Sequence, residues 1–276
     1  MIIFAIPLRA KATTKNWDFC VERFNATIQS IFNQTNPNFK CLVACNDIPK
    51  LKKEYDDRLE FIQVNTAIPM EWIEMARDKF WKLTAIAVRV HEILEQQSNP
   101  ENGIYVMPVD ADDLLNCHIS QWCAEHPNEH GAVSNNGYVW RQGEKIFRRY
   151  HDMHTYCGSC NVIKMYLDDL PKNMPYPDEQ ALEQSVAKEL NARYPIRYDH
   201  NIVVERYEKS GKPFARLPFK STVYVLGTGE NISSIAHATN NRSEEKRFHP
   251  IAFLRSINIF SMRYISCRVK KEFGIQ

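Results

Sequence analysis

Long apolar runs, an excess of charge of one sign and a cysteine framework are all missing from this 276-residue chain. No run approaches the roughly 20 apolar residues that a membrane-spanning helix needs, and no charged segment followed by a long apolar core opens the chain. The 35 Lys and Arg nearly balance the 33 Asp and Glu, so composition gives no electrostatic case for binding nucleic acid. We therefore expect a protein of the reducing cytoplasm.

The eight cysteines are scattered through the chain rather than spaced as in a small disulfide-rich domain. Cys157 and Cys160 have the spacing of a redox pair, but they lead into an apolar stretch and not into a helix that would lower a thiol pKa. Adding Cys117 and Cys123 would give a zinc site with a poor five-residue gap between those two. We predict structural, reduced cysteines.

The first 115 residues alternate between strand and helix patterns. Apolar, β-type runs occur at 2–9, 39–45, 59–64 and 103–109, and apolar residues recur with a helical period at 17–34 and 71–97. The order strand, helix, strand, strand, helix, strand predicts a mostly parallel sheet covered by helices. At 44% hydrophobic residues, the chain is large enough to bury one sizeable core.

The most informative stretch ends the fourth of these strands, where a short apolar run leads into Asp110, Asp112 and Asp113. On an extended chain Asp110 and Asp112 point to the same side, so their carboxylates repel unless a cation lies between them. Hard oxygen ligands at a strand end suit Mg²⁺ or Mn²⁺ carrying a substrate phosphate. The alternative is a solvated acidic turn in which Asp113 caps a following helix.

This acidic stretch resembles the DxD segment of GT-A glycosyltransferases, which use nucleotide-sugar donors. It is most similar to the form found in the large inverting family that includes chondroitin and cellulose synthases. The resemblance covers about residues 2–235 and rests on five segments in the same order. It implies an α/β, GT-A (Rossmann-like) fold with a mostly parallel central sheet flanked by helices. The catalytic domain would span 1–245, with a nucleotide-binding half (1–115) and an acceptor half (116–245).

The resemblance also implies donor-binding residues in the first half. Pro7 and Arg9, after the first strand, would meet the base and ribose, and Asp47, after the second, would contact the base. Arg9 fits equally well as a surface cation, and Asp47 as part of an ordinary turn. Lys82 lies four residues after Asp78 on one helix face, so it either forms a salt bridge there or reaches the donor phosphates.

The segments after the acids predict a hairpin at 134–149 and another strand at 156–163. In GT-A folds a strand of small residues at this place lies beside the donor sugar, and Gly158 and Ser159 fit that role. The hairpin aromatics Tyr138 and Trp140 would either stack on a sugar or belong to the core.

A helix over 175–190, opened by two prolines and two acids, is a good helix start by itself. It also resembles the ED-x-x-L segment of the inverting family, in which the second acid is the catalytic base. By register that base is Glu179. Because the acid pair is reversed in this sequence, Asp178 remains the alternative.

Two further metal and donor candidates follow in the sequence. The run 227–233 is similar to the GxNxS segment that closes many GT-A domains, and its Asn231 would approach the diphosphate. His237 would complete the metal shell or is an ordinary helix histidine, and His200 is a weaker candidate of the same kind.

The tail over 246–273 interleaves apolar and basic residues and predicts a C-terminal amphipathic helix. Such a helix suits an anionic membrane surface, and packing against the catalytic domain or a partner subunit explains it equally well.

The resemblance thus implies a metal-dependent, hexosyltransferase-type glycosyltransferase with Mn²⁺ or Mg²⁺ as cofactor. It would move a sugar, with inversion, from a nucleotide-diphosphate sugar to a glycan or lipid-linked acceptor in bacterial surface polysaccharide assembly, such as capsule or lipopolysaccharide. It would be cytoplasmic, or peripheral on the inner face of the plasma membrane. A sugar nucleotidyltransferase is one alternative, although the loop Pro7-Leu-Arg-Ala lacks the glycines expected of it. A non-catalytic sugar- or nucleotide-binding module is another.

Overall fold

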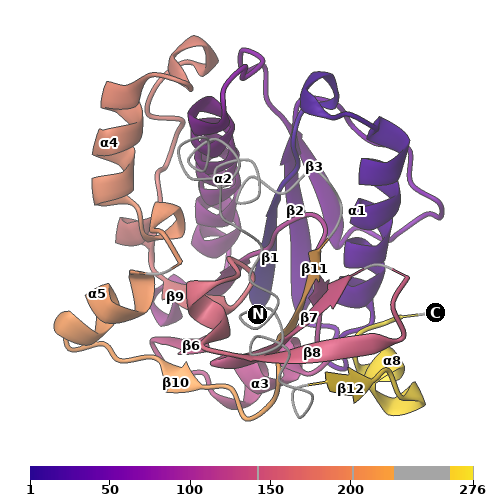
Figure 1. The fold of residues 1–276 in the computed structure, drawn as a ribbon. Coiled ribbons are helices and arrows are strands. Elements are labelled where there is room, and N and C mark those ends of the chain that lie inside the picture. The colour runs from indigo at the N-terminus through magenta and orange to yellow at the C-terminus, as the bar shows by residue number, and fades with distance from the viewer. Residues whose placement is uncertain (142, 201, 227–261, 276) are drawn as a thin grey trace, which may run out of the picture.

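The computed structural model describes residues 1–275 except 142, 201 and 227–261 (Figure 1). The first half contains the six predicted elements, β2 with the predicted bounds and the others slightly shorter: β1 (Ile2–Pro7), α1 (Trp17–Phe32), β2 (Phe39–Cys45), β3 (Leu59–Gln63), α2 (Trp72–Glu95) and β4 (Ile104–Pro108). The alternation read from the sequence is therefore confirmed.

The central sheet has seven strands in the order β10-β6-β9-β4-β1-β2-β3. Three of these strands come from the second half of the chain: β6 (Gly131–Val133), β9 (Asn161–Met165) and β10 (Ala215–Arg216). Only β9 runs against the others, because β1 to β4 pair in parallel, β9 is antiparallel to β4 and β6, and β10 is parallel to β6. The mostly parallel α/β sheet is confirmed, and strand order reverses between β1 and β4.

Alternation along β1 explains the helical layers. Ile2, Phe4 and Ile6 pack with apolar residues of α1, and Ile3 and Ala5 pack with α2 on the opposite face. Figure 1 shows α2 and α4 (Gln184–Arg193) covering one face of the sheet and α1 the other. The layer with α1 also includes α3 (Ile119–Glu125), and that with α2 includes α5 (Val203–Lys209). Both faces of the sheet are thus buried, as a parallel sheet requires.

The acidic stretch leads directly into a second sheet, whose strand order is β12-β8-β7-β11-β5. Its strands are β5 (Leu114–Leu115), β7 (Asn136–Arg141), β8 (Ile146–His151), β11 (Thr222–Leu226) and β12 (Met262–Tyr264). The predicted hairpin is confirmed as the antiparallel pair β7 and β8. Because β5 follows Asp113 directly, the alternative in which Asp113 caps a following helix was wrong.

Two further expectations were wrong in their bounds. The strand predicted over 156–163 begins only at Asn161, so Gly158 and Ser159 lie in the turn before it. The helix predicted over 175–190 splits into a 3₁₀ turn, Asp178–Gln180, and α4. The Arg77 guanidinium donates to the Leu182 carbonyl at 2.8 Å, which gives that carbonyl a partner outside any helix.

The described part of the tail is not one continuous helix: β12 is followed by the short α8 (Cys267–Glu272). Phe273 is fully buried and Ile265 nearly so, and both pack with Tyr138 and Phe147 of the second sheet. The alternative of packing against the catalytic domain therefore holds for residues 262–275. Among the helices that the structure describes, none combines the length and the apolar character needed to cross a bilayer.

Candidate functional site

A pocket of about 350 Å³ opens at the carboxyl ends of β1 and β4. Its walls come from the loop after β1, the first turns of α1, the first half of α2, the acidic loop, the turn before β9, residues 199–200 and β11. In open α/β sheets, ligands bind outside the carboxyl ends of strands at the point where strand order reverses. The pocket lies at that point between β1 and β4.

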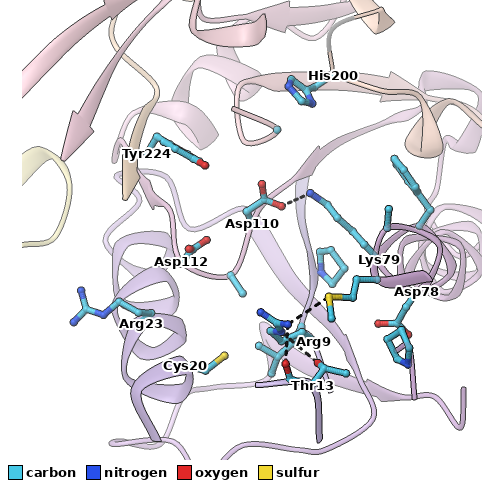
Figure 2. Close-up of a pocket in the computed structure, with 18 of the residues that line it drawn as sticks. Arg9, Thr13, Cys20, Arg23, Asp78, Lys79, Asp110, Asp112, His200 and Tyr224 are labelled. Atoms are coloured by element: carbon cyan, nitrogen blue, oxygen red, sulfur yellow. Dashed lines mark hydrogen bonds and ion pairs between the residues drawn. The ribbon is translucent and has the colours of Figure 1, made fainter. Parts of the chain in front are cut away.

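Asp110 and Asp112 both line the pocket (Figure 2). The Lys79 ammonium, from α2, forms an ion pair with the Asp110 carboxylate, and the two side chains remain 30% and 29% exposed. Burial acts to lower the pKa of Lys79, but the attraction of Asp110 outweighs it and the net pKa is raised. A positive charge therefore already rests against one of the two predicted metal-binding carboxylates.

The third acid, Asp113, has a different environment because it is fully buried. Its carboxylate accepts hydrogen bonds from Ser159 Oγ at 2.7 Å, Cys157 Sγ at 3.1 Å and the Val225 amide at 3.4 Å. Burial raises its pKa well above the usual range. Asp113 thus joins three segments around the pocket and is not a ligand for anything in it.

The cysteines agree with the sequence prediction. All eight are free in the structure, and Cys157 is fully engaged in packing and in its contact with Asp113. Burial raises the pKa of the Cys157 thiol, which disfavours a reactive thiolate.

Lys82 does not line the pocket. Its ammonium lies 2.6 Å from Asp78 Oδ2, with side chains only 1% and 5% exposed. Asp78 Oδ1 accepts from Thr66 Oγ1 at 3.0 Å, and Thr66 Oγ1 in turn accepts from Asn46 Nδ2 at 3.0 Å. Of the two interpretations of the Asp78–Lys82 pair, the structure shows the salt bridge, which fixes α2 to the ends of β2 and β3.

The loops after β1 and β2 differ in their relation to the pocket. Pro7 and Arg9 line it, and the Arg9 guanidinium donates to the Thr13 carbonyl at 2.9 Å (Figure 2). Asp47 lies outside it, and its Oδ2 accepts from the Lys11 amide at 2.8 Å. Asp47 therefore ties the loop after β2 to the loop that carries Arg9, outside the pocket.

Neither predicted base lines the pocket. Asp178 Oδ1 accepts from the buried Trp81 Nε1 at 2.9 Å, and its Oδ2 accepts from the Asn65 amide at 2.7 Å. Glu179 is exposed. The structure does not bring this acid pair to Asp110, because Asp178 is used to satisfy two other polar groups.

The structure does bring His200 to the pocket (Figure 2), beside Asp199, whose Oδ1 is 3.5 Å from His200 Nδ1. Burial is the largest influence on His200 and lowers its pKa; Lys79 also lowers it, and Asp199 and Asp110 partly oppose this. Its imidazole is therefore neutral at pH 7 and able to accept a proton. In the sequence, only a polar segment, Tyr-Asp-His-Asn, marks this residue.

Asn231 and His237 lie outside the described residues. Within the described part of the chain, no group of three or more His, Cys, Asp or Glu side chains is placed to hold a metal ion. Asp110 and Asp112 remain the predicted metal ligands within this part.

No family model matches this chain, and no curated protein matches it by sequence. Among solved structures it is similar to 2-C-methyl-D-erythritol 4-phosphate cytidylyltransferase from Francisella tularensis, with 11% identity, a TM-score of 0.39 and coverage of 86% of this chain and 98% of the other. It is also similar to a protein assigned as a nucleotide-diphospho-sugar transferase from Desulfovibrio desulfuricans G20, with 10% identity, a TM-score of 0.36 and coverage of 94% of both chains. Similarity at this level carries no weight for function, which has to be inferred from the site itself.

Proposed function

We propose that this chain is a metal-dependent glycosyltransferase that moves a sugar from a nucleotide-diphosphate donor to a hydroxyl of a glycan or lipid-linked acceptor, of the kind used in bacterial surface glycans. The observation that carries the proposal is the position of Asp110 and Asp112. Both line a pocket at the point of strand-order reversal, and three cationic side chains, Arg9, Arg23 and Lys79, line the same pocket. Carboxylates beside cations suit a diphosphate and a divalent ion together.

The acid pair fits a divalent cation by its chemistry, since Asp110 already holds a positive group and Asp112 lines the same cavity. Asp110 and Asp112 would hold Mn²⁺ or Mg²⁺, which supplies positive charge against the diphosphate as it leaves. Substrate oxygens and water would supply its other ligands, as is usual for Mg²⁺ sites with one or two protein carboxylates. Lys79 would then direct its ammonium to the diphosphate.

His200 is the base in this proposal, in place of the acid pair expected from the sequence. The acceptor hydroxyl transfers its proton to the neutral imidazole as its oxygen bonds to the anomeric carbon. The bond from that carbon to the diphosphate oxygen breaks, and the nucleoside diphosphate leaves. Attack from the face opposite the leaving group inverts the configuration at the anomeric carbon.

Nucleotide binding tests the proposal directly. We expect UDP, GDP, CDP or dTDP to raise the melting temperature of the protein only when Mn²⁺ is present, since a ligand at 100 times its Kd stabilises by about 2.7 kcal/mol. Asp112→Asn should remove this dependence on Mn²⁺ while leaving the far-UV circular dichroism unchanged. Undiminished Mn²⁺-dependent binding in that variant would reject the metal role of Asp112.

The products separate this activity from nucleotidyl transfer. A glycosyltransferase releases a nucleoside diphosphate from the sugar nucleotide, whereas a nucleotidyltransferase releases pyrophosphate from a nucleoside triphosphate and a sugar phosphate. Phosphorus NMR of the two incubations distinguishes these products. Pyrophosphate in the second, with none of the first reaction, would overturn the proposal.

A further inference from the structure

Three tyrosines form a continuous aromatic surface that begins inside the pocket and ends at the protein surface. Tyr150, on β8, stacks on Tyr156 with ring centroids 4.8 Å apart and planes at 29°. Tyr156 meets Tyr224, on β11, edge to face at 5.1 Å and 74°. Tyr156 and Tyr224 line the pocket, and Tyr150 extends beyond it. We call these three residues the tyrosine shelf.

The chain turns sharply between Tyr150 and Tyr156. Asp152, between the two stacked rings in sequence, has φ of 55°, and no other non-glycine residue in the described segments has a positive φ. The next residues form a 3₁₀ turn, in which the Thr155 amide donates to the Asp152 carbonyl at 2.9 Å. A left-handed conformation is unfavourable for a non-glycine residue and often marks a functional constraint. Here it turns the chain so that Tyr156 lies back against Tyr150.

The shelf is also fixed relative to the acidic loop. Cys157, which follows Tyr156, donates to the Asp113 carboxylate at 3.1 Å. Ser159 Oγ donates to the same carboxylate at 2.7 Å and accepts from the Asp110 amide at 2.8 Å. Hydrogen bonds therefore join the segment that follows Tyr156 to the acidic loop that carries Asp110.

The shelf differs from the hairpin aromatics considered in the sequence. Tyr138 is 7% exposed and packs in the core with Phe147, and Trp140 donates its indole N–H to the Glu144 carbonyl at 2.9 Å. By contrast, Tyr150 and Tyr156 are 40% and 41% exposed. An ordered aromatic stack that remains this exposed beside a pocket is available to a ligand.

We propose that the tyrosine shelf binds the acceptor and that the acceptor presents a pyranose ring to it. The C–H groups on one face of a pyranose pack against an aromatic face, while its ring-edge hydroxyls stay in water, which suits a half-exposed tyrosine. This assignment rests on the proposed function. Figure 2 shows Tyr224 and Arg9 on opposite sides of Asp110, so a donor nucleotide on the Arg9 side leaves the Tyr224 side to the acceptor.

The position of His200 agrees with this arrangement. It lines the pocket together with Tyr156 and Tyr224 and lies close enough to Asp110 to feel its charge. An acceptor hydroxyl that extends from the shelf toward Asp110 therefore passes the group proposed to take its proton. The shelf supplies the orientation that such a transfer needs.

Carbohydrate binding to variants of the full chain tests the shelf. The probes are the methyl α- and β-pyranosides of glucose, galactose, mannose, rhamnose and N-acetylglucosamine, measured by saturation-transfer NMR with UDP and Mn²⁺ present and absent. We expect at least one pyranoside to bind and Tyr150→Ala to weaken it about tenfold, the equivalent of one aromatic contact. Tyr150→Phe keeps the ring and should retain binding.

The matched control is Tyr264→Ala, which removes a 71% exposed tyrosine of the same sheet that does not line the pocket.

Equal pyranoside binding by wild type and Tyr150→Ala, or no pyranoside binding at all, overturns the proposal. So does a Tyr150→Ala variant that loses UDP and keeps the pyranoside, because the shelf then holds the nucleobase. If pyranosides bind in a Tyr150-dependent manner but no nucleotide binds, the carbohydrate site stands and the proposed function fails. A Tyr156→Phe variant that keeps binding supports a role for the ring alone should Tyr150→Ala prove unstable.

Discussion

Helix α2 carries two lysine–aspartate ion pairs whose environments are opposite. Lys82 and Asp78 are one turn apart on the helix and are almost completely buried. Lys79 reaches across to Asp110, and this pair is about 30% exposed. A buried pair fixes structure, because removing one partner strands a charge without solvent. In a pair that opens to a pocket, the lysine can exchange its carboxylate partner for a ligand. The difference in exposure therefore predicts a structural role for Lys82 and a ligand-binding role for Lys79.

The buried pair should give the largest effect on stability. We expect Lys82→Met to lower the free energy of unfolding by about 3–5 kcal/mol, since Asp78 is left charged and buried. Lys209→Met is the matched control, because Lys209 and Glu205 form the same i,i+4 type of pair with side chains 74% and 62% exposed. That control should lose no more than about 0.5 kcal/mol. Urea denaturation measures both, and equal losses would refute the comparison.

The exposed pair should affect the reaction and not the fold. We expect Lys79→Met to change the free energy of unfolding by less than about 1 kcal/mol. Its loss of a charged hydrogen bond to the diphosphate, about 1.5–3 kcal/mol, should weaken nucleotide binding by about 10- to 100-fold. Isothermal titration with a nucleoside diphosphate and Mn²⁺ measures this. Nucleotide affinity equal to wild type would show that Lys79 pairs only with Asp110.

The exposed pair should also influence the pH dependence through His200. Because burial lowers the pKa of His200, with Lys79 as a further cause, the folded state binds this proton less readily than the unfolded state. Stability from this group is therefore complete above the unfolded value of about 6.5 and falls as the pH is lowered through 6.5 toward the folded pKa. Turnover should fall only below pH 6.5, when the imidazole becomes protonated. Lys79→Met should move this acidic limb to higher pH, whereas an unmoved limb would show that Lys79 and His200 are not coupled.

A surface ion pair on α8 should give the smallest effect on the free energy of unfolding. Arg268 and Glu272 on α8 have side chains 88% and 25% exposed, so Arg268→Ala should leave the free energy of unfolding within about 0.5 kcal/mol of wild type.

The predicted membrane contact of the tail can be tested on the same helix. If it exists, replacing Arg268, Lys270 and Lys271 together should weaken binding to anionic vesicles by about 1 kcal/mol per cation. Flotation at low and high salt measures this, and equal recovery of both proteins would reject the membrane contact.

Local patterns in the sequence were sufficient where local contacts decide the structure. The strand Phe39–Cys45 was predicted to the residue, because a short β-rich apolar run ends there in turn residues. Asp110 and Asp112 were found for the same reason, since a strand end places them by itself. The failures at 156–160 and 178–183 come from hydrogen bonds to distant residues, such as Cys157 to Asp113 and Arg77 to Leu182.

The site needed more than the sequence could supply. Lys79 is 31 residues from Asp110, and no spacing rule pairs a helix residue with the end of the next strand. The sequence pointed to Lys82 and not to Lys79, because helical spacing shows which residues share a face but not which face is buried. His200 and the tyrosine shelf likewise depend on how the second sheet packs against the first.

The hydrogen bonds of Asp113 affect when, during folding, the acidic loop reaches its final geometry. Its three hydrogen-bond donors lie 44, 46 and 112 residues further along the chain. Contacts at such separation close late in folding, because the entropy of the intervening loop must be lost before they form. On the ribosome the strands of the first half emerge well before Val225, so Asp113 lacks one of its three donors until β11 has been synthesised. Ordered binding of a ligand at Asp110 and Asp112 would therefore report that nearly the whole chain has folded.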